Sequence, residues 1–142
     1  MAVRSAEAEW DGGLQDGTGR MRLGSGAFEG AYSFNSRFAE GKGTNPEELI
    51  GAAHAGCFSM ALAANLGQEN VKPAHIRTAA KVHIDRAAEG MAITRIELET
   101  EAKIPGYDPE KFAELAERTK RDCPVSKALA GTTITLTARL VD

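Results

Sequence analysis

The chain has 142 residues, of which 42% are hydrophobic and 26% charged, a composition typical of a globular protein. Its formal net charge is −3, its basic residues are scattered, and only 6% of its residues are aromatic. These figures exclude a disordered chain and argue against nucleic acid or an anionic membrane as partner, and the length favours a single domain over residues 1–142.

The first 43 residues are rich in glycine and predict short strands at residues 3–10, 19–23 and 30–34, separated by turns. A Gly-Lys pair after these strands resembles a phosphate-binding loop. The pattern fails, because Ser36 stands where its first glycine belongs and Gly43 stands where the Ser or Thr after the lysine belongs. Nucleotide binding is therefore rejected.

A long helix is predicted to begin after Asn45, a good N-cap, with Pro46 at its first position and Glu48 completing what is nearly a capping box. Residues 49–68 contain no Asp, Glu, Lys or Arg. The length of this stretch would permit a membrane span, but it is interrupted by glycine and polar residues and is rich in alanine. We interpret it as the buried central helix of a soluble protein.

The sequence then predicts a hairpin, since apolar residues alternate through residues 76–84 and again after a turn at residues 87–90. In the second strand Met91 and Ile93 have odd numbers, whereas Ile96 and Leu98 have even numbers. A strand should not exchange its faces, so we expect a β-bulge near Thr94 and Arg95.

An amphipathic helix is predicted over residues 108–120, and a short helix should begin at Pro124. A last strand over residues 133–141 should turn Ile134, Leu136 and Leu140 inward. Hairpins that are segregated from helices indicate the α+β class and not a doubly wound sheet.

Two cysteines are the candidates for chemistry. Cys123 precedes Pro124, and a thiolate at a helix N-terminus is stabilised by unpaired N–H groups, although an ordinary loop cysteine fits the same sequence. Cys57 lies in the charge-free helix, where a thiol needs a cation from elsewhere to become reactive. His54, one turn earlier, is either a base for Cys57 or a buried core residue. No zinc-type ligand spacing and no serine nucleophile elbow is visible, so neither a metal nor a cofactor is expected.

Two segments resemble the OsmC/Ohr family of osmotically induced proteins and organic hydroperoxide reductases. The first runs from Phe34-Asn35-Ser36-Arg37-Phe38 through Gly43-Thr44-Asn45-Pro46-Glu47-Glu48 to His54-Ala55-Gly56-Cys57-Phe58-Ser59-Met60, and the second is Cys123-Pro124-Val125-Ser126. The resemblance covers nearly the whole chain. It implies curved antiparallel sheets around a long buried central helix, in an intertwined homodimer with two active sites at the subunit interface.

The resemblance also implies the roles of four residues. Cys57 would be the peroxidatic cysteine and Cys123 the resolving cysteine, with Arg37 holding Cys57 as a thiolate and Glu47 orienting Arg37. Glu47 and Cys57 are about 15 Å apart along one helix axis, so Glu47 is expected to act through Arg37. Without the resemblance, Arg37 would be a solvated cation and Glu47 a first-turn acid.

The function implied is a thiol peroxidase of oxidative and osmotic stress defence, which reduces organic hydroperoxides through a Cys57 sulfenic acid and a Cys57–Cys123 disulfide. An external dithiol, such as a dihydrolipoyl protein, would reduce that disulfide. A thiol redox sensor and an apolar-ligand-binding protein on the same fold are the alternatives. Residues 1–7 lack the long apolar stretch of a secretory signal, and a cytoplasmic location is expected.

Overall fold

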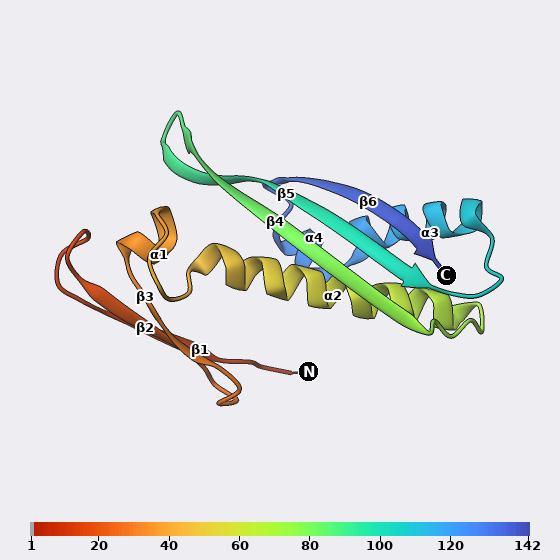
Figure 1. Cartoon of the computed structure of the whole chain (residues 1–142), viewed down its shortest axis with the longest axis horizontal. Coiled ribbons are helices and arrows are strands. Elements are labelled where there is room, and N and C mark those ends of the chain that lie inside the picture. Colours follow the sequence, from red (N-terminus) through yellow and green to blue (C-terminus); the bar gives the residue numbers. More distant parts are fainter. Residues whose placement is uncertain (1) are drawn as a thin grey trace. The chain divides into compact units, whose positions relative to one another are not determined.

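The computed structural model of the chain describes residues 2–142 and forms two compact units, the first ending at Leu49 and the second covering Ile50–Asp142 (Figure 1). Each unit contains a three-stranded sheet, and one long helix begins in the first unit and continues into the second. This confirms the α+β class. That residues 1–142 form a single domain stays a prediction.

The first unit is an antiparallel sheet followed by a short helix. Its elements are β1 (Ala6–Asp11), β2 (Thr18–Leu23), β3 (Glu29–Tyr32) and α1 (Phe34–Phe38), and the strands are ordered β1-β2-β3. The strands lie within a few residues of their predicted positions. One face carries ion pairs such as Arg20–Glu29 at 2.8 Å, while on the other face the rings of Trp10 and Tyr32 are 5.4 Å apart.

The sequence did not predict α1, the helix that carries Arg37. Ser33 caps it: the Ser33 hydroxyl accepts a hydrogen bond from the Ser36 N–H at 3.1 Å, and the Ser36 hydroxyl accepts one from the Ser33 N–H at 2.8 Å. This is a reciprocal capping box with serine at both positions. The Ser36 hydroxyl also donates to the Thr44 carbonyl at 2.7 Å, which ties the helix to the segment before α2.

Helix α2 (Pro46–Gln68) begins where the sequence predicts, because the Glu48 N–H donates to the Asn45 side-chain oxygen at 2.8 Å. It is the one helix of the described chain that is long and apolar enough to cross a membrane, with a mean hydropathy of 1.4, judged by length and composition alone. The core helix of a soluble protein passes the same test.

Burial of α2 follows a strict helical spacing. His54, Phe58, Leu62 and Leu66 are each 0% exposed and recur every four residues, whereas Met60 on the opposite side is 78% exposed. The expectation of a wholly buried helix therefore holds for one face only. The physical reason is that the elements of the second unit pack against one side of the helix.

The second unit begins its sheet with a long hairpin of β4 (His75–Ala87) and β5 (Gly90–Lys103). His83 pairs with Arg95 and Ile84 pairs with Ile93, so Thr94 has no partner in the ladder. This confirms the bulge predicted from the change of parity.

Strand β6 (Thr133–Val141) corrects the expectation of antiparallel sheets, since it runs parallel to β5 with Ile96 opposite Ile134 and Leu98 opposite Leu136. The chain between these strands forms α3 (Pro109–Asp122) and α4 (Pro124–Ala128). These helices return the chain to the end of the sheet near which β5 begins, so β6 runs in the same direction as β5. The inward direction of Ile134, Leu136 and Leu140 is confirmed.

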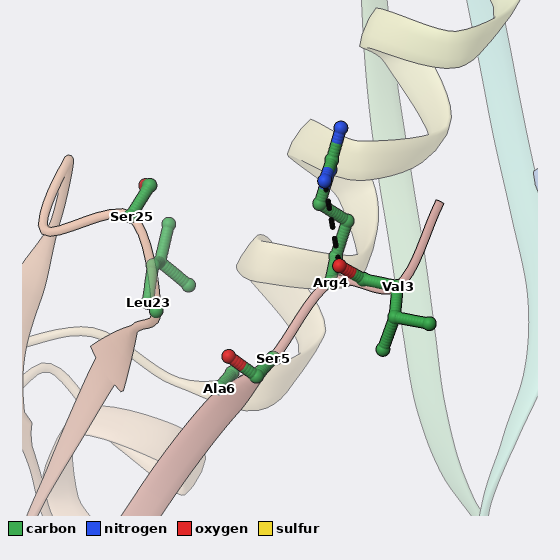
Figure 2. A pocket seen from close by; sticks show the side chains of 7 residues that line it. Val3, Arg4, Ser5, Ala6, Leu23 and Ser25 are labelled. Atoms are coloured by element: carbon green, nitrogen blue, oxygen red, sulfur yellow. Dashed lines mark hydrogen bonds between the residues drawn. The ribbon is translucent and has the colours of Figure 1, made fainter. Parts of the chain in front are cut away.

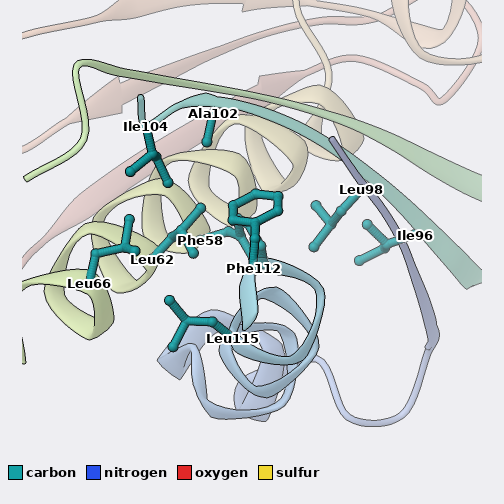
Figure 3. Close-up of a cluster of buried hydrophobic side chains, with 9 residues drawn as sticks. All are labelled: Phe58, Leu62, Leu66, Ile96, Leu98, Ala102, Ile104, Phe112 and Leu115. Carbon is teal, nitrogen blue, oxygen red and sulfur yellow. The ribbon is translucent and has the colours of Figure 1, made fainter. Parts of the chain in front are cut away.

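The core of the second unit lies between α2, α3 and the sheet (Figure 3). Figure 3 shows Phe112 and Leu115 of α3 turned toward the apolar face of α2, with side chains of β5 and the segment after it beside them. The buried cluster consists of Phe58, Leu62, Leu66, Ile96, Leu98, Ala102, Ile104, Phe112 and Leu115. This packing fixes the face of α2 on which His54 lies, and holds α3 and α4 at one side of that helix.

Candidate active site

The two cysteines meet in the second unit. Cys57 lies in the middle of α2, Cys123 lies between α3 and α4, and their sulfur atoms are 3.0 Å apart and share a hydrogen bond. Both thiols are free. A spacing this short brings the pair within reach of a disulfide by small side-chain movements.

Cys123 lies at the junction of two helices, as the C-cap of α3 and the N-cap of α4, and the sequence predicts this N-cap position. It is 0% exposed. Burial raises the pKa of its thiol, but the neighbouring Cys57, Ser126 and Val125 outweigh burial and lower the pKa overall.

Cys57 is affected in the opposite direction. Burial and then the hydrogen bond with Cys123 raise the pKa of the Cys57 thiol, and a hydrogen bond from the Val125 N–H offsets this only in part. Contacts inside the second unit therefore oppose ionisation of Cys57. A Cys57 thiolate needs an additional cation.

His54 is buried and does not bond to Cys57. Its Nε2 lies 2.8 Å from the Ser126 hydroxyl oxygen, and burial lowers the pKa of its imidazole, which keeps the ring neutral. Of the two interpretations that the sequence left open, the role of base for Cys57 is not supported by a direct contact.

Arg37 and Glu47 meet in the first unit. Arg37 extends from α1, and its Nε and Nη2 both donate to the carboxylate of Glu47 in the first turn of α2, at 2.7 to 3.2 Å. The Glu47 side chain is only 8% exposed, whereas that of Arg37 is 37% exposed. Nη1 makes no hydrogen bond to any residue that the structure describes, so one edge of the guanidinium is bound and the other is open.

The structure thus forms two pairs, one of sulfurs in the second unit and one of ions in the first. The contact between Arg37 and Glu47 is the one that the sequence led us to expect. Ser126, whose hydroxyl oxygen lies 2.8 Å from His54 Nε2, was missed as a candidate. The available signal was its place three residues after the N-cap Cys123, the position at which side chains and caps commonly interact.

A small pocket of about 260 Å³ opens beside Arg37 within the first unit. Aromatic rings form much of its wall, and the Arg37 guanidinium carbon lies 5.1 Å from the centre of the Phe38 ring. Its lining residues are Trp10, Leu14, Tyr32, Ser33, Phe34, Arg37 and Phe38. A cavity with apolar walls and one cation suits a small molecule with an alkyl or aryl part and a polar end.

A larger and more open hollow of about 630 Å³ lies beside β1 and the turn after β2 (Figure 2). Figure 2 shows the side chains along it, with the Arg4 guanidinium bonded to the Val3 carbonyl in the segment before β1. It holds no thiol, imidazole or carboxylate, so we assign it no chemistry. Within residues 2–142 no three His, Cys, Asp or Glu side chains are grouped as a metal site would require.

Comparisons with known proteins agree on one family. Residues 39–138 match the family model described as OsmC-like protein. The chain is 45% identical over 127 residues to the peroxiredoxin OsmC of Escherichia coli, covering 89% of each chain. It is 34% identical over 94 residues to an organic hydroperoxide resistance protein of Xanthomonas axonopodis pv. citri, covering 66% of this chain and 64% of that one.

Solved structures agree with the fold. The organic hydroperoxide resistance protein OhrB of Bacillus subtilis superposes with a TM-score of 0.72 at 26% identity, covering 96% of this chain and 98% of that one. An organic hydroperoxide resistance protein of Elizabethkingia anophelis gives a TM-score of 0.73 at 24% identity, covering 99% and 98%.

Proposed function

The chain belongs to the OsmC-like protein family, and from this premise we propose that it is a thiol peroxidase that reduces organic hydroperoxides to alcohols. The named relatives support a peroxide-related, antioxidant oxidoreductase activity. The observation that carries the proposal is the 3.0 Å separation of the Cys57 and Cys123 sulfurs, which suits a catalytic disulfide.

In the proposed peroxide step, the Cys57 thiolate attacks the outer peroxide oxygen. The S–O bond forms, the O–O bond breaks, and the departing alkoxide takes up a proton to become the alcohol, leaving Cys57 as a sulfenic acid. Cys123 then attacks the Cys57 sulfur, and the disulfide forms with loss of one water. Cys57 is the better candidate for the first step because it is part-exposed, whereas Cys123 is fully buried.

Arg37 is the proposed cation for Cys57. Two observations support this role: Glu47 binds one edge of the guanidinium and fixes its direction, and the Nη1 edge has no hydrogen-bond partner among residues 2–142. A fixed cation would stabilise the thiolate and then the negative charge on the departing oxygen. Because contacts in the second unit raise the pKa of Cys57, a cation is required for a thiolate near neutral pH.

The pocket beside Arg37 supports an organic substrate. Its aromatic walls would take the alkyl or aryl part of the hydroperoxide, with the peroxide group at the open edge of the guanidinium. Hydrogen peroxide has no apolar part to use this wall and should be a poorer substrate.

We propose further that the protein is a cytoplasmic homodimer and that an external dithiol, of the dihydrolipoyl type, reduces the disulfide. The exposed face of α2 beyond its first turn supports the dimer, since over residues 49–68 it carries no charge and mostly apolar and small residues. The exposed positions of this stretch are Ala52, Ala53, Gly56, Met60, Ala64, Gly67 and Gln68. An apolar strip along a whole helix is typical of an interface.

Turnover of cumene hydroperoxide with dithiothreitol as reductant tests this function. The parent chain should turn over, and one equivalent of hydroperoxide should lower its intact mass by two hydrogens. Cys57→Ser should abolish both, and Cys123→Ser should leave a sulfenic acid that a dimedone reagent traps. Ser59→Ala, two residues from Cys57 on the same helix, is the matched control and should remain active. Turnover that survives Cys57→Ser would exclude the mechanism, and no turnover in the parent would favour a sensor or binding protein.

A further inference from the structure

A buried hydrogen bond joins α2, which carries Cys57, to α4, which Cys123 caps. His54 is on α2, three residues before Cys57, and Ser126 is on α4, three residues after Cys123. The two side chains are 0% and 5% exposed, and His54 Nε2 lies 2.8 Å from Ser126 Oγ. Each is about one helical turn from a cysteine, and the proposed peroxidase cycle gives neither a task.

At the end that begins after Cys123, helix α4 has one buried side chain to anchor it, that of Ser126. The helix is five residues long, too short to be stable without contacts to the rest of the fold. Its N-cap, Cys123, makes no side-chain capping bond to any residue that the structure describes. Leu129 packs against the core from the other end of α4. The bond to His54 is therefore the buried polar contact that attaches the Cys123 end of α4 to α2.

Histidine is unfavourable for stability at position 54. Its Nδ1 is buried and has no hydrogen-bond partner among residues 2–142. A buried polar atom without a partner destabilises a fold, and most buried polar atoms have one. His54 continues the buried face of Phe58 and Leu62, where an apolar side chain would leave no such atom. Its bond to Ser126 is a better reason for a histidine here than core packing is.

We propose, on the basis of the peroxidase function above, that His54 and Ser126 are positioning residues whose hydrogen bond keeps Cys123 within reach of Cys57. The two sulfurs are 3.0 Å apart and a disulfide is about 2.05 Å long, so they need to approach by about 1 Å. If α4 moved away from α2, side-chain rotation alone would not close the gap. The bond would then control disulfide formation and leave the peroxide step unaffected.

The fate of the Cys57 sulfenic acid reports how closely Cys123 is held. In the resolving step Cys123 loses its proton and its sulfur attacks the Cys57 sulfur. The S–S bond forms, the S–O bond breaks, and the departing hydroxide takes up the proton to become water. A sulfenic acid that Cys123 does not reach meets a second hydroperoxide, which oxidises it to a sulfinic acid and is itself reduced to the alcohol.

A second bond from α2 provides a matched control. The Asn65 side chain donates to the Thr119 hydroxyl on α3 at 2.8 Å, and Thr119 is 0% exposed. Asn65 lies eight residues after Cys57, about 12 Å along the helix axis. Asn65→Ala should therefore lower the stability of the fold without changing the separation of the sulfurs, and it separates a positioning role from a general loss of stability.

The test follows the oxidised forms of Cys57 by intact mass as the excess of cumene hydroperoxide is raised. Ser126→Ala should consume the first equivalent at the parent rate and form the disulfide about fivefold more slowly, the effect of one lost hydrogen bond. Half conversion to sulfinic acid should then need about one fifth of the parent's hydroperoxide concentration. His54→Leu should act alike and add little to Ser126→Ala, since both remove the same bond. Asn65→Ala should match the parent.

A slower peroxide step in Ser126→Ala, an unchanged partition between disulfide and sulfinic acid, or an equal shift in Asn65→Ala would overturn the proposal. A measurement with oxidised glutathione makes the test independent of peroxidase activity. Cys57 displaces one glutathione to form a mixed disulfide, and Cys123 then displaces the second to close the Cys57–Cys123 disulfide. Ser126→Ala should accumulate about fivefold more mixed disulfide than the parent. In a chain without peroxidase activity, this accumulation would still support the positioning role, and its absence would overturn it.

Discussion

The ion pair of Arg37 and Glu47 gives the sharpest test of how the first unit contributes. Glu47→Gln keeps the size and shape of the side chain but removes its charge and replaces one acceptor oxygen by an NH₂ group. The Arg37 Nε and Nη2 donors, now 2.7 to 3.2 Å from carboxylate oxygens, would lose a charged partner and face a competing donor.

The magnitude follows from burial. A hydrogen bond to a charged group contributes about 1.5–3 kcal/mol when it is shielded, and the Glu47 side chain is 8% exposed. The Arg37 side chain is 37% exposed, so solvent screening brings the expected loss to about 1–2 kcal/mol. The first turn of α2 adds about 0.3–1 kcal/mol for loss of a negative charge near the helix N-terminus.

Glu48→Gln is the matched control, because Glu48 is exposed in the same turn of α2 and forms no ion pair within residues 2–142. Both variants lose a first-turn charge, so urea unfolding at fixed protein concentration should show Glu47→Gln less stable than Glu48→Gln by the ion-pair contribution of about 1–2 kcal/mol, with equal m-values. If Glu47 orients Arg37 for catalysis, kcat/KM for cumene hydroperoxide should fall about tenfold in Glu47→Gln only. Equal stabilities refute the energetic argument, and equal kcat/KM values refute the orienting role.

Two further predictions concern the faces of α2. Burial lowers the pKa of His54, so below the ordinary histidine pKa of about 6.5 the unfolded chain binds more protons than the folded chain. The free energy of unfolding should therefore decrease as the pH is lowered through this range, by up to about 1.4 kcal/mol per pH unit. His54→Gln should reduce this slope in urea unfolding, and an unchanged slope would contradict a buried neutral imidazole. Met60→Lys on the exposed face should shift the sedimentation of the protein from dimer to monomer, whereas Met91→Lys, a control on β5, should leave it unchanged; a dimeric Met60→Lys protein would remove this face from the interface.

Alternation of side chains was enough to predict the β4–β5 hairpin down to its bulge. Met91 and Ile93 could share a face with Ile96 and Leu98 only if one residue were left out of the ladder, and Thr94 is that residue. The start of α2 was predictable for a similar reason, because an Asn45 cap followed by Pro46 is a local signal that needs no tertiary contact.

Features that depend on neighbours across the fold were not predictable. The direction of β6 is decided by where α3 and α4 return the chain, and no residue of β6 itself records it. Helix α1 is five residues long and depends on a serine pair, Ser33 and Ser36, that a strand could contain equally well. The charge-free sequence of α2 predicted burial on all sides, whereas within one chain only the side that carries Phe58 and Leu62 is covered.

The cysteines show how far one sequence can reach into mechanism. The position of Cys123 before Pro124 predicted which thiol ionises more readily, since N–H groups at a helix start are a local property. The sequence could not show that Cys57 would lose its proton less readily, because it is partly buried and because Cys123 lies 3.0 Å away and competes for the same charge. Two thiols this close do not both ionise readily, and the lowered pKa of Cys123 favours the negative charge on that sulfur. Attack on a peroxide by Cys57 therefore requires a group that reverses this preference, and reversal by a cation such as Arg37 would leave Cys123 protonated until the sulfenic acid has formed.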